Sequence, residues 1–305
     1  MYELKRIVVA VNLTELDEEV VRYASIVSRI MDADSVYFVH VAETLDLPDD
    51  LAEEYRQVLA PVDETIQHEM QHLVDDYFPH GEHTQVSIDV LQGNPTDELI
   101  RYGKQKDADL IILGKPDGFP RKPKLRKVAE ISTCSVLFVP EGADIKIDKI
   151  AVALDFSDHA QRALSQAIKF TEEGKDVTIY GHHVYQIPKG YSKTGKSYED
   201  FSQIMEENAK KESKKFFDNH NLDKNICEMR YQLSEDTKID DELFGFAQQK
   251  DVDLMIIGSR GRTAAASILL GSVAERLLAY HTNIPLFMVK EKNSNMSFLE
   301  ALLSL

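Results

Sequence analysis

Short apolar runs alternate along this chain with longer stretches whose apolar residues recur at helical spacing. In the first half the amphipathic stretches are Glu15–Met31, Leu51–Tyr77 and Thr96–Lys106. The apolar runs beside them are Ile7–Val11, Val36–Val41, Val86–Leu91, Leu110–Leu113 and Val136–Val139. Strands that alternate with helices are typical of βαβ units, so the pattern predicts a parallel sheet.

The second half of the chain repeats the first in order and in kind. Arg6–Asn12 aligns with Lys149–Asp155, and Asp107–Gly114 aligns with Asp251–Gly258. The matching apolar runs are Ile150–Leu154, Val177–Val184, Ile226–Leu233, Leu254–Ile257 and Leu286–Val289. Because self-similarity at a long period marks repeated structural units, we interpret the chain as a duplication.

The apolar pattern also orders the strands within each copy. The first and fourth runs are nearly continuous, which indicates strands buried on both faces of a sheet. The third run of the first copy is apolar at every second position, which suits an edge strand with one wet face. We expect two tandem doubly wound α/β domains, each with a five-stranded parallel sheet of order 3-2-1-4-5 flanked by helices. The linker Pro140–Asp144 divides them into residues 1–143 and 144–305.

Distinctive residues follow the strands of the second copy. In a doubly wound sheet a ligand binds beyond the carboxyl ends of the strands, where the winding reverses. There the chain has Asp155 after the first strand, Val184 at the end of the second and Gly258-Ser259-Arg260-Gly261 after the fourth. Gly271-Ser272 then opens a predicted helix, whose free N–H groups suit a phosphate. The alternative is a plain glycine turn with Ser272 as the helix N-cap.

This spacing resembles the ATP-binding signature of the universal stress protein family, and Ile150–Ser157 resembles that family's first strand and its aspartate. The resemblance covers nearly the whole chain as two tandem domains. It implies a site for ATP, with or without Mg²⁺, and neither catalytic residues nor metal ligands. Asp155 and the backbone of Val184 would face the adenosine, while ribose and phosphates would lie against Gly258, Ser259, Arg260, Gly261, Gly271, Ser272 and Val273.

The first copy departs from this pattern. Asn12 stands where the second copy has Asp155, and Arg126-Lys127 stands in place of Gly271-Ser272. Side chains there would obstruct a close approach of the backbone to a ligand, although two basic residues could still attract an anion. We therefore predict a degenerate nucleotide site in the first domain. The aligned histidines, His40 and His183, are interpreted as packed structural residues.

Composition narrows the class of partner. The net charge of −17 would repel a phosphate backbone, so we expect no nucleic-acid partner. No apolar run reaches the roughly 18 residues of a membrane-spanning helix, and Met1–Val11 does not resemble a signal peptide. We therefore expect a cytoplasmic protein that binds no membrane. Cys134 and Cys227 are expected to be buried free thiols.

Two further patterns compete with the nucleotide site. His68-Glu69-Met70-Gln71-His72 fits HExxH, the motif in which two histidines bind zinc beside a glutamate. The apolar residues of this helix fall on one face, so we interpret both histidines as part of a solvated face. The apolar tail, residues 296–305, suits an amphipathic helix that packs on its own domain or serves self-association.

Several functions remain open at this point. The first is an ATP-binding regulator or sensor of a stress response, in which hydrolysis is slow or absent. The second is an enzyme, either a slow ATPase or a metal-dependent hydrolase that uses His68 and His72. The third is a scaffold for a partner protein, in which nucleotide is incidental. A homodimer is compatible with each of these functions.

Overall fold

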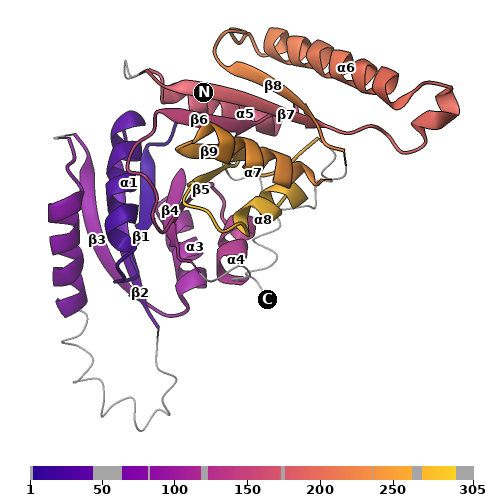
Figure 1. The fold of residues 1–305 in the computed structure, drawn as a ribbon. Helices are drawn as coiled ribbons and strands as arrows, with labels where there is room; N and C mark the ends of the chain where they lie inside the picture. Colours follow the sequence, from indigo (N-terminus) through magenta and orange to yellow (C-terminus); the bar gives the residue numbers. More distant parts are fainter. Residues whose placement is uncertain are drawn as a thin grey trace. The chain divides into compact units, whose positions relative to one another are not determined.

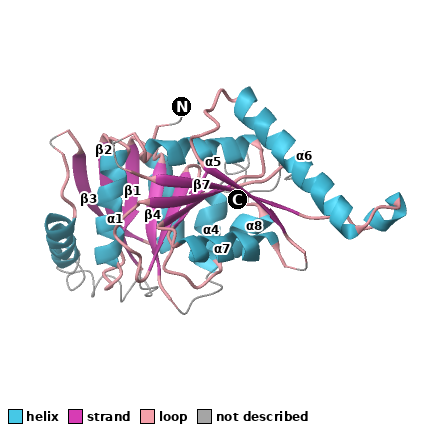
Figure 2. Cartoon of the chain, turned by 45° about the horizontal axis from the view of Figure 1, so that its top comes forward, coloured by secondary structure: helices cyan, strands magenta, loops and turns pink. Residues whose placement is uncertain are grey.

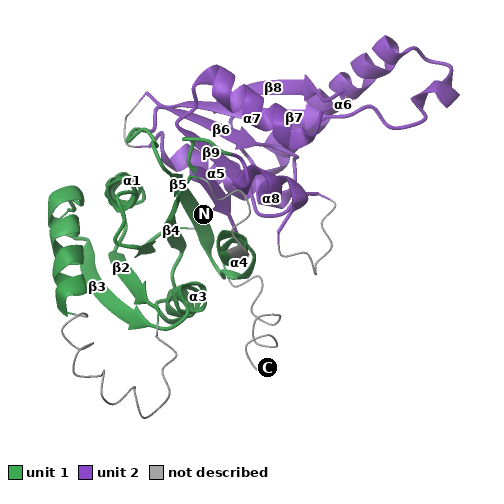
Figure 3. Ribbon diagram, turned by 60° about the horizontal axis from the view of Figure 1, so that its bottom comes forward, with its two compact units in different colours: residues 1–146, 281–285, 291–305 green, residues 147–280, 286–290 purple. Residues whose placement is uncertain are grey.

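A computed structural model describes residues 3–43, 64–81, 83–117, 123–172, 176–235, 237–262 and 270–292, and its elements are labelled in Figure 1. The chain divides into two compact units, coloured separately in Figure 3. Unit 1 comprises residues 1–146, 281–285 and 291–305, and unit 2 comprises residues 147–280 and 286–290. The domain limits inferred from the linker, 1–143 and 144–305, stay a prediction.

Unit 1 is built on five parallel strands in the order β3-β2-β1-β4-β5. The strands are β1 Arg6–Ala10, β2 Ser35–Ala42, β3 Gln85–Gln92, β4 Leu110–Lys115 and β5 Ser135–Pro140. The helices are α1 Asp17–Ile30, one over residues 64–77, α3 Pro95–Gln105 and α4 Pro123–Ile131. Each predicted strand is present to within two residues, and the first part of the predicted helix Leu51–Tyr77 lies outside the described residues.

Unit 2 repeats this arrangement in the order β8-β7-β6-β9-β10, again with all strands parallel. Its strands are β6 Lys149–Ala153, β7 Thr178–Tyr185, β8 Glu228–Leu233, β9 Leu254–Gly258 and β10 Leu286–Val289. Its helices are α5 Asp158–Lys169, the short 3₁₀ helix η1 Tyr191–Thr194, α6 Tyr198–Asn219, α7 Ile239–Lys250 and α8 Ser272–Leu278. The predicted fold class and strand order are therefore confirmed.

Helices cover both faces of the sheet in unit 2. Right-handed crossovers that run first one way and then the other along a sheet leave their helices on opposite faces. Figure 2 shows this, with α5 on one side of the strands and α7 and α8 on the other. The central strand β9 is buried at every residue, as its continuous apolar sequence predicts, and burial on both faces makes it the middle of the core.

The predicted edge strands do lie at the edges, but their burial differs from the expected alternation. From residue 86 to 91 every residue of β3 is half-buried, so neither face is fully wet. One reason is α3, from which Tyr102 donates a hydrogen bond to Asp89. The long amphipathic side chains of Tyr102 and Lys106 also cover this edge, since Lys106 lies over the Tyr102 ring.

One buried carboxylate per unit joins the two central strands at their amino ends. In unit 1 the Oδ2 atom of Asp109 accepts hydrogen bonds from the backbone N–H groups of Lys5 at 3.0 Å and Arg6 at 2.8 Å. In unit 2 Asp253 accepts in the same way from Asp148 at 2.9 Å and Lys149 at 2.8 Å. Both carboxylates are buried, and each occupies the same place in the repeat.

Cys134 and Cys227 are buried free thiols, as predicted. Within the described ranges, no helix is long and apolar enough to cross a membrane. The apolar tail, residues 296–305, lies outside the described residues.

Asp253→Ala should destabilise unit 2 by about 2–4 kcal/mol, because two part-buried N–H groups lose their acceptor. Asp253→Asn keeps one acceptor oxygen and should lose only about half as much. Urea-induced unfolding of both variants and the wild type measures the difference. A cost for Asp253→Ala no larger than that of an exposed substitution would contradict the structural role of this carboxylate.

Candidate functional site

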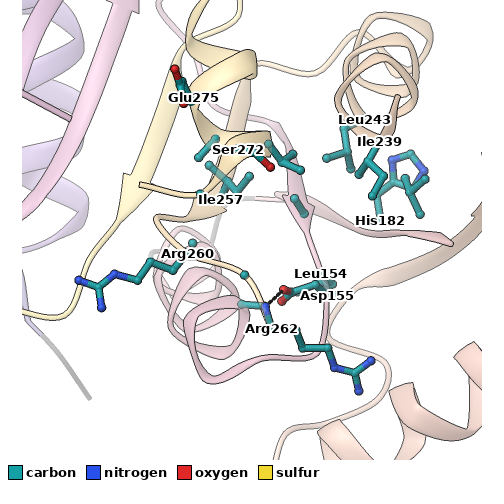
Figure 4. Close-up of a pocket in the computed structure, with 18 of the residues that line it drawn as sticks. Leu154, Asp155, His182, Ile239, Leu243, Ile257, Arg260, Arg262, Ser272 and Glu275 are labelled. Carbon is teal, nitrogen blue, oxygen red and sulfur yellow. Dashed lines mark hydrogen bonds between the residues drawn. The ribbon is translucent and has the colours of Figure 1, made fainter. Parts of the chain in front are cut away.

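A cavity of about 500 Å³ lies in unit 2 at the carboxyl ends of β6, β7 and β9. The beginnings of α7 and α8 complete its wall, as the close-up in Figure 4 shows. Eight of the nine residues predicted from the sequence line it: Asp155, Val184, Gly258, Arg260, Gly261, Gly271, Ser272 and Val273. The ninth, Ser259, is buried behind the wall, where its N–H donates to the Val289 carbonyl at 2.9 Å.

Asp155 connects the loop after β6 with the glycine loop after β9. Its Oδ1 atom accepts hydrogen bonds from the N–H of Ser157 at 3.1 Å and the hydroxyl of Ser157 at 2.6 Å. Its Oδ2 atom accepts from the N–H of Arg262 at 2.7 Å, the contact drawn in Figure 4. The carboxylate therefore holds two segments that are far apart in sequence at one edge of the sheet.

The residue after Asp155 bends the chain and leaves its side chain on the face away from the cavity. Phe156 has φ 64°, a conformation that is uncommon outside glycine. Its ring stacks on His183 with centroids 4.3 Å apart, and His183 Nδ1 donates to the Leu154 carbonyl at 2.6 Å. In unit 1 His40 Nδ1 bonds to the Val11 carbonyl at 2.8 Å in the same way, so both histidines are packed structural residues as predicted.

None of the three site glycines has a positive φ, and two of them, Gly258 and Gly261, are needed for close packing. A Cβ atom at Gly258 would lie 2.8 Å from the backbone of His159, so this glycine lets β9 approach α5. At Gly261 it would lie 3.0 Å from Asp155 Oδ2. At Gly271 the nearest atom would be Ser259 O at 3.4 Å, an ordinary contact, so the fold itself tolerates a side chain there.

The start of α8 presents backbone N–H groups to the cavity. Gly271 is the N-cap, with its own N–H donated to the Ser259 carbonyl at 2.8 Å. Ser272 is therefore the first residue of the helix, and the alternative assignment of Ser272 as N-cap is wrong. The N–H groups of a first helical turn have no acceptor within the helix. Those of Ser272 and Val273, with the Ser272 hydroxyl, stand at the cavity wall.

Other lining residues were missed by the sequence analysis. His182 lies two residues before Val184 on β7, so strand alternation alone puts it on the same face of the sheet. Ile239 and Leu243 come from the first turns of α7, for which the sequence had offered no chemical motif. Figure 4 shows these three side chains together, on the side of the cavity opposite Arg260. The Arg260 side chain itself extends away from Asp155.

Unit 1 has a counterpart cavity of about 550 Å³, lined by Asn12, Val41 and Gly114 among others. The basic side chains near it are paired with carboxylates. Arg126 bonds to Glu130 at 2.8 Å, Lys127 to Asp97 at 2.5 Å and Lys124 to Glu43 at 3.1 Å. These cations are therefore already neutralised by partners of the same unit.

The HExxH helix does not form a metal centre in the described part of the chain. His68, Glu69 and His72 are all exposed, while Met70 and Val74 of the same helix are buried. The two imidazoles lie 4.4 Å apart, but no group of three or more metal-ligating side chains occurs among the described residues. The prediction of a solvated histidine face is confirmed.

Fold and site together define a class of protein: tandem doubly wound α/β domains, with a glycine-lined cavity at the switch point of the second sheet. A family model described as the universal stress protein family matches residues 3–140 and again residues 146–290. The chain therefore belongs to the universal stress protein family, as two tandem domains.

Individual relatives agree with this assignment. Universal stress protein MJ0577 of Methanocaldococcus jannaschii is 27% identical over 159 residues, which are 48% of this chain and 96% of the relative. The crystal structure of PA1789 from Pseudomonas aeruginosa PAO1, called functionally unknown, has a TM-score of 0.65 at 16% identity over 99% of this chain and 97% of that one. An Archaeoglobus fulgidus universal stress protein solved with dAMP is 18% identical over 45% of this chain and 98% of that one. Its TM-score is 0.29, so the dAMP of that structure is not assigned to this chain.

Stability should fall in mild acid because of His182, which is 1% exposed. Burial lowers its pKa from the ordinary 6.5 to about 4, so the folded protein disfavours the imidazolium. The contribution of the neutral His182 side chain to the free energy of unfolding is complete above pH 6.5. It is lost, by up to about 3 kcal/mol, as pH falls towards 4. The free energy of unfolding, measured with urea from pH 7 to pH 4.5, should depend less steeply on pH in His182→Val than in the wild type. Equal slopes in both proteins would contradict the prediction.

Proposed function

We propose that unit 2 binds an adenine nucleotide, ATP, and that the protein acts in the cytoplasm as a stress-response regulator or sensor. The observation that carries this proposal is the convergence on one cavity of eight predicted residues, which span positions 155 to 273 of the sequence. Its volume of about 500 Å³ lies within the range of small-molecule sites, roughly 300–1,000 Å³.

The two ends of the cavity differ in the way that a nucleotide requires. The glycine loop and the start of α8 supply N–H groups and the Ser272 hydroxyl, which suit phosphate oxygens. Val184, Ile239 and Leu243 supply an apolar surface, which suits a planar base. Asp155 lies beside Arg262 of the glycine loop in Figure 4, and its oxygens retain lone pairs for ribose hydroxyl groups.

Binding fits this site better than turnover. Asp155 already accepts three hydrogen bonds that hold its own loop and the glycine loop. A carboxylate whose oxygens are already engaged in this way is poorly placed to take a proton from water. Mg²⁺, where it accompanies ATP, would be held mainly by the phosphates and by water, as this ion usually is.

We further propose that the unit 1 site is degenerate for nucleotide. It lacks the Asp155 equivalent, since Asn12 stands there. At the position of Gly271-Ser272 it has Arg126-Lys127, whose charges are paired with Glu130 and Asp97. Neither basic residue is therefore an unpaired anion ligand.

The double variant Gly271→Arg, Ser272→Lys should weaken ATP binding at least tenfold, because long side chains then occupy the space over the start of α8. The wild type should bind one ATP per chain by isothermal titration calorimetry. The reciprocal variant Arg126→Gly, Lys127→Ser is the matched control and should retain wild-type affinity. Equal affinity of wild type and the Gly271, Ser272 variant would remove the site assignment.

Asp155→Asn, which introduces the residue of the first unit, should weaken ATP binding about tenfold. The amide keeps one acceptor but no charge, and it can no longer accept from Ser157 and Arg262 together with a ribose hydroxyl. Asp158→Asn, an exposed change in the first turn of α5, is the control. Titration of both variants with ATP measures the effect, and unchanged affinity in Asp155→Asn would exclude a ligand at this carboxylate.

A further inference from the structure

His182 is a buried polar residue in the wall of the cavity, and part of its hydrogen-bonding capacity is unused. The side chain is 1% exposed, and its ring packs at 4.4 Å, centroid to centroid, against Phe246 of α7. Nε2 lies 3.2 Å from Oε1 of Gln232 on β8, whereas Nδ1 is buried and has no hydrogen-bond partner among the residues that the structure describes. A buried polar atom without a partner costs free energy and calls for an explanation.

A chain of hydrogen bonds determines which nitrogen of His182 carries the proton. The side-chain amide of Gln232 donates through Nε2 to Glu242 of α7, so its Oε1 atom is directed at His182. An amide oxygen only accepts, so His182 Nε2 must be the donor. Turning the Gln232 amide over would set its oxygen against the Glu242 carboxylate, which is unfavourable. Nδ1 of the neutral ring is therefore a hydrogen-bond acceptor.

His182 is one of the residues that line the cavity, on the side formed by β7 and α7. Figure 4 places His182 beside Ile239 and Leu243, at the apolar end, away from the glycine loop and Arg260. If phosphates lie against the glycine loop, the base of the nucleotide lies against this end. A neutral acceptor there is satisfied by an N–H donor on the base and opposed by a carbonyl oxygen.

We propose that His182 selects the base of the bound nucleotide, with its Nδ1 atom accepting a hydrogen bond from an exocyclic amine such as that of adenine. This inference rests on the proposed nucleotide site and adds the residue that distinguishes adenine from other purines there. Purines that carry a carbonyl oxygen at the same position, as in hypoxanthine, are disfavoured.

The counterpart position in unit 1 supports a role specific to unit 2. Val39 of β2 lines the unit 1 cavity where His182 of β7 lines the other, since each lies two residues before the valine that the two units share. In unit 1 a valine fills the equivalent strand position without any polar group. Histidine is therefore not required by the fold at this position.

The test compares ATP with inosine triphosphate, which has a carbonyl oxygen in place of the exocyclic amine. Calorimetric titration of the full chain should show ATP bound at least tenfold more tightly. In His182→Val the two affinities should become nearly equal, chiefly through weaker ATP binding. Glu242→Gln, which releases the Gln232 amide, should reduce the discrimination without removing the histidine. Lys214→Gln, an exposed change on α6, serves as the control and should keep the wild-type ratio.

A spectroscopic readout covers the case in which His182→Val does not fold. In ¹⁵N NMR spectra of the wild type, His182 should show the Nε2–H tautomer, and its Nδ1 resonance should shift with ATP but not with inosine triphosphate. ATP binding with no preference over inosine triphosphate, or an unchanged preference in folded His182→Val, would overturn the role of His182 and leave the nucleotide site intact. Binding of neither nucleotide would overturn both proposals.

Discussion

The buried carboxylates of Asp109 and Asp253 are the constraint on which each unit depends. Each accepts the two N–H groups at the start of the first strand while standing at the start of the fourth. The two central strands are thereby aligned at their amino ends, with Ile150 opposite Leu254 in unit 2. Because β6 and β9 each contain five residues, their carboxyl ends are also nearly level. Asp155 and the glycine loop meet as a consequence.

The two units show how one frame supports different sites. In unit 1 the loop after β1 is held by Asp17 of α1, which accepts from the N–H groups of Asn12 at 3.1 Å and Thr14 at 2.6 Å. Burial raises the pKa of Asp17, while these N–H groups oppose that shift. In unit 2 the equivalent loop is held by Asp155 from within. The side chain of residue 12 is therefore not needed to hold this loop, as that of residue 155 is, and an asparagine there leaves the fold intact.

The fold could be predicted from the sequence because the apolar pattern of each strand and helix is local and occurs in both halves of the chain. Apolar periodicity located the strands, and duplication tested each assignment a second time. Aspartate, glycine and serine of the cavity were predictable because they stand out beside a strand end or a helix start, whereas Val273 was predicted from the family resemblance alone. His182 and Leu243 could not be found in this way, because a strand histidine and a helix leucine are both ordinary core residues. Ser272 was assigned correctly to the cavity but the N-cap alternative failed, since glycine occupies that position.

Because the net charge of the chain is −17, an anionic ligand in the cavity would need a local source of positive potential. Two arginine side chains of unit 2 are bonded to carboxylates: Arg262, which lines the cavity, bonds to Glu212 of α6 at 3.0 Å, and Arg276 of α8 bonds to Asp240 of α7 at 2.5 Å. In the proposed nucleotide site, backbone N–H groups are a further source of attraction for phosphate oxygens, because they carry partial positive charge. Such groups are directional, so they act only if the loop has a fixed conformation. Asp155 supplies that condition, because it accepts a hydrogen bond from the N–H of Arg262 in this loop. The side chain of the same arginine bonds to Glu212 of α6.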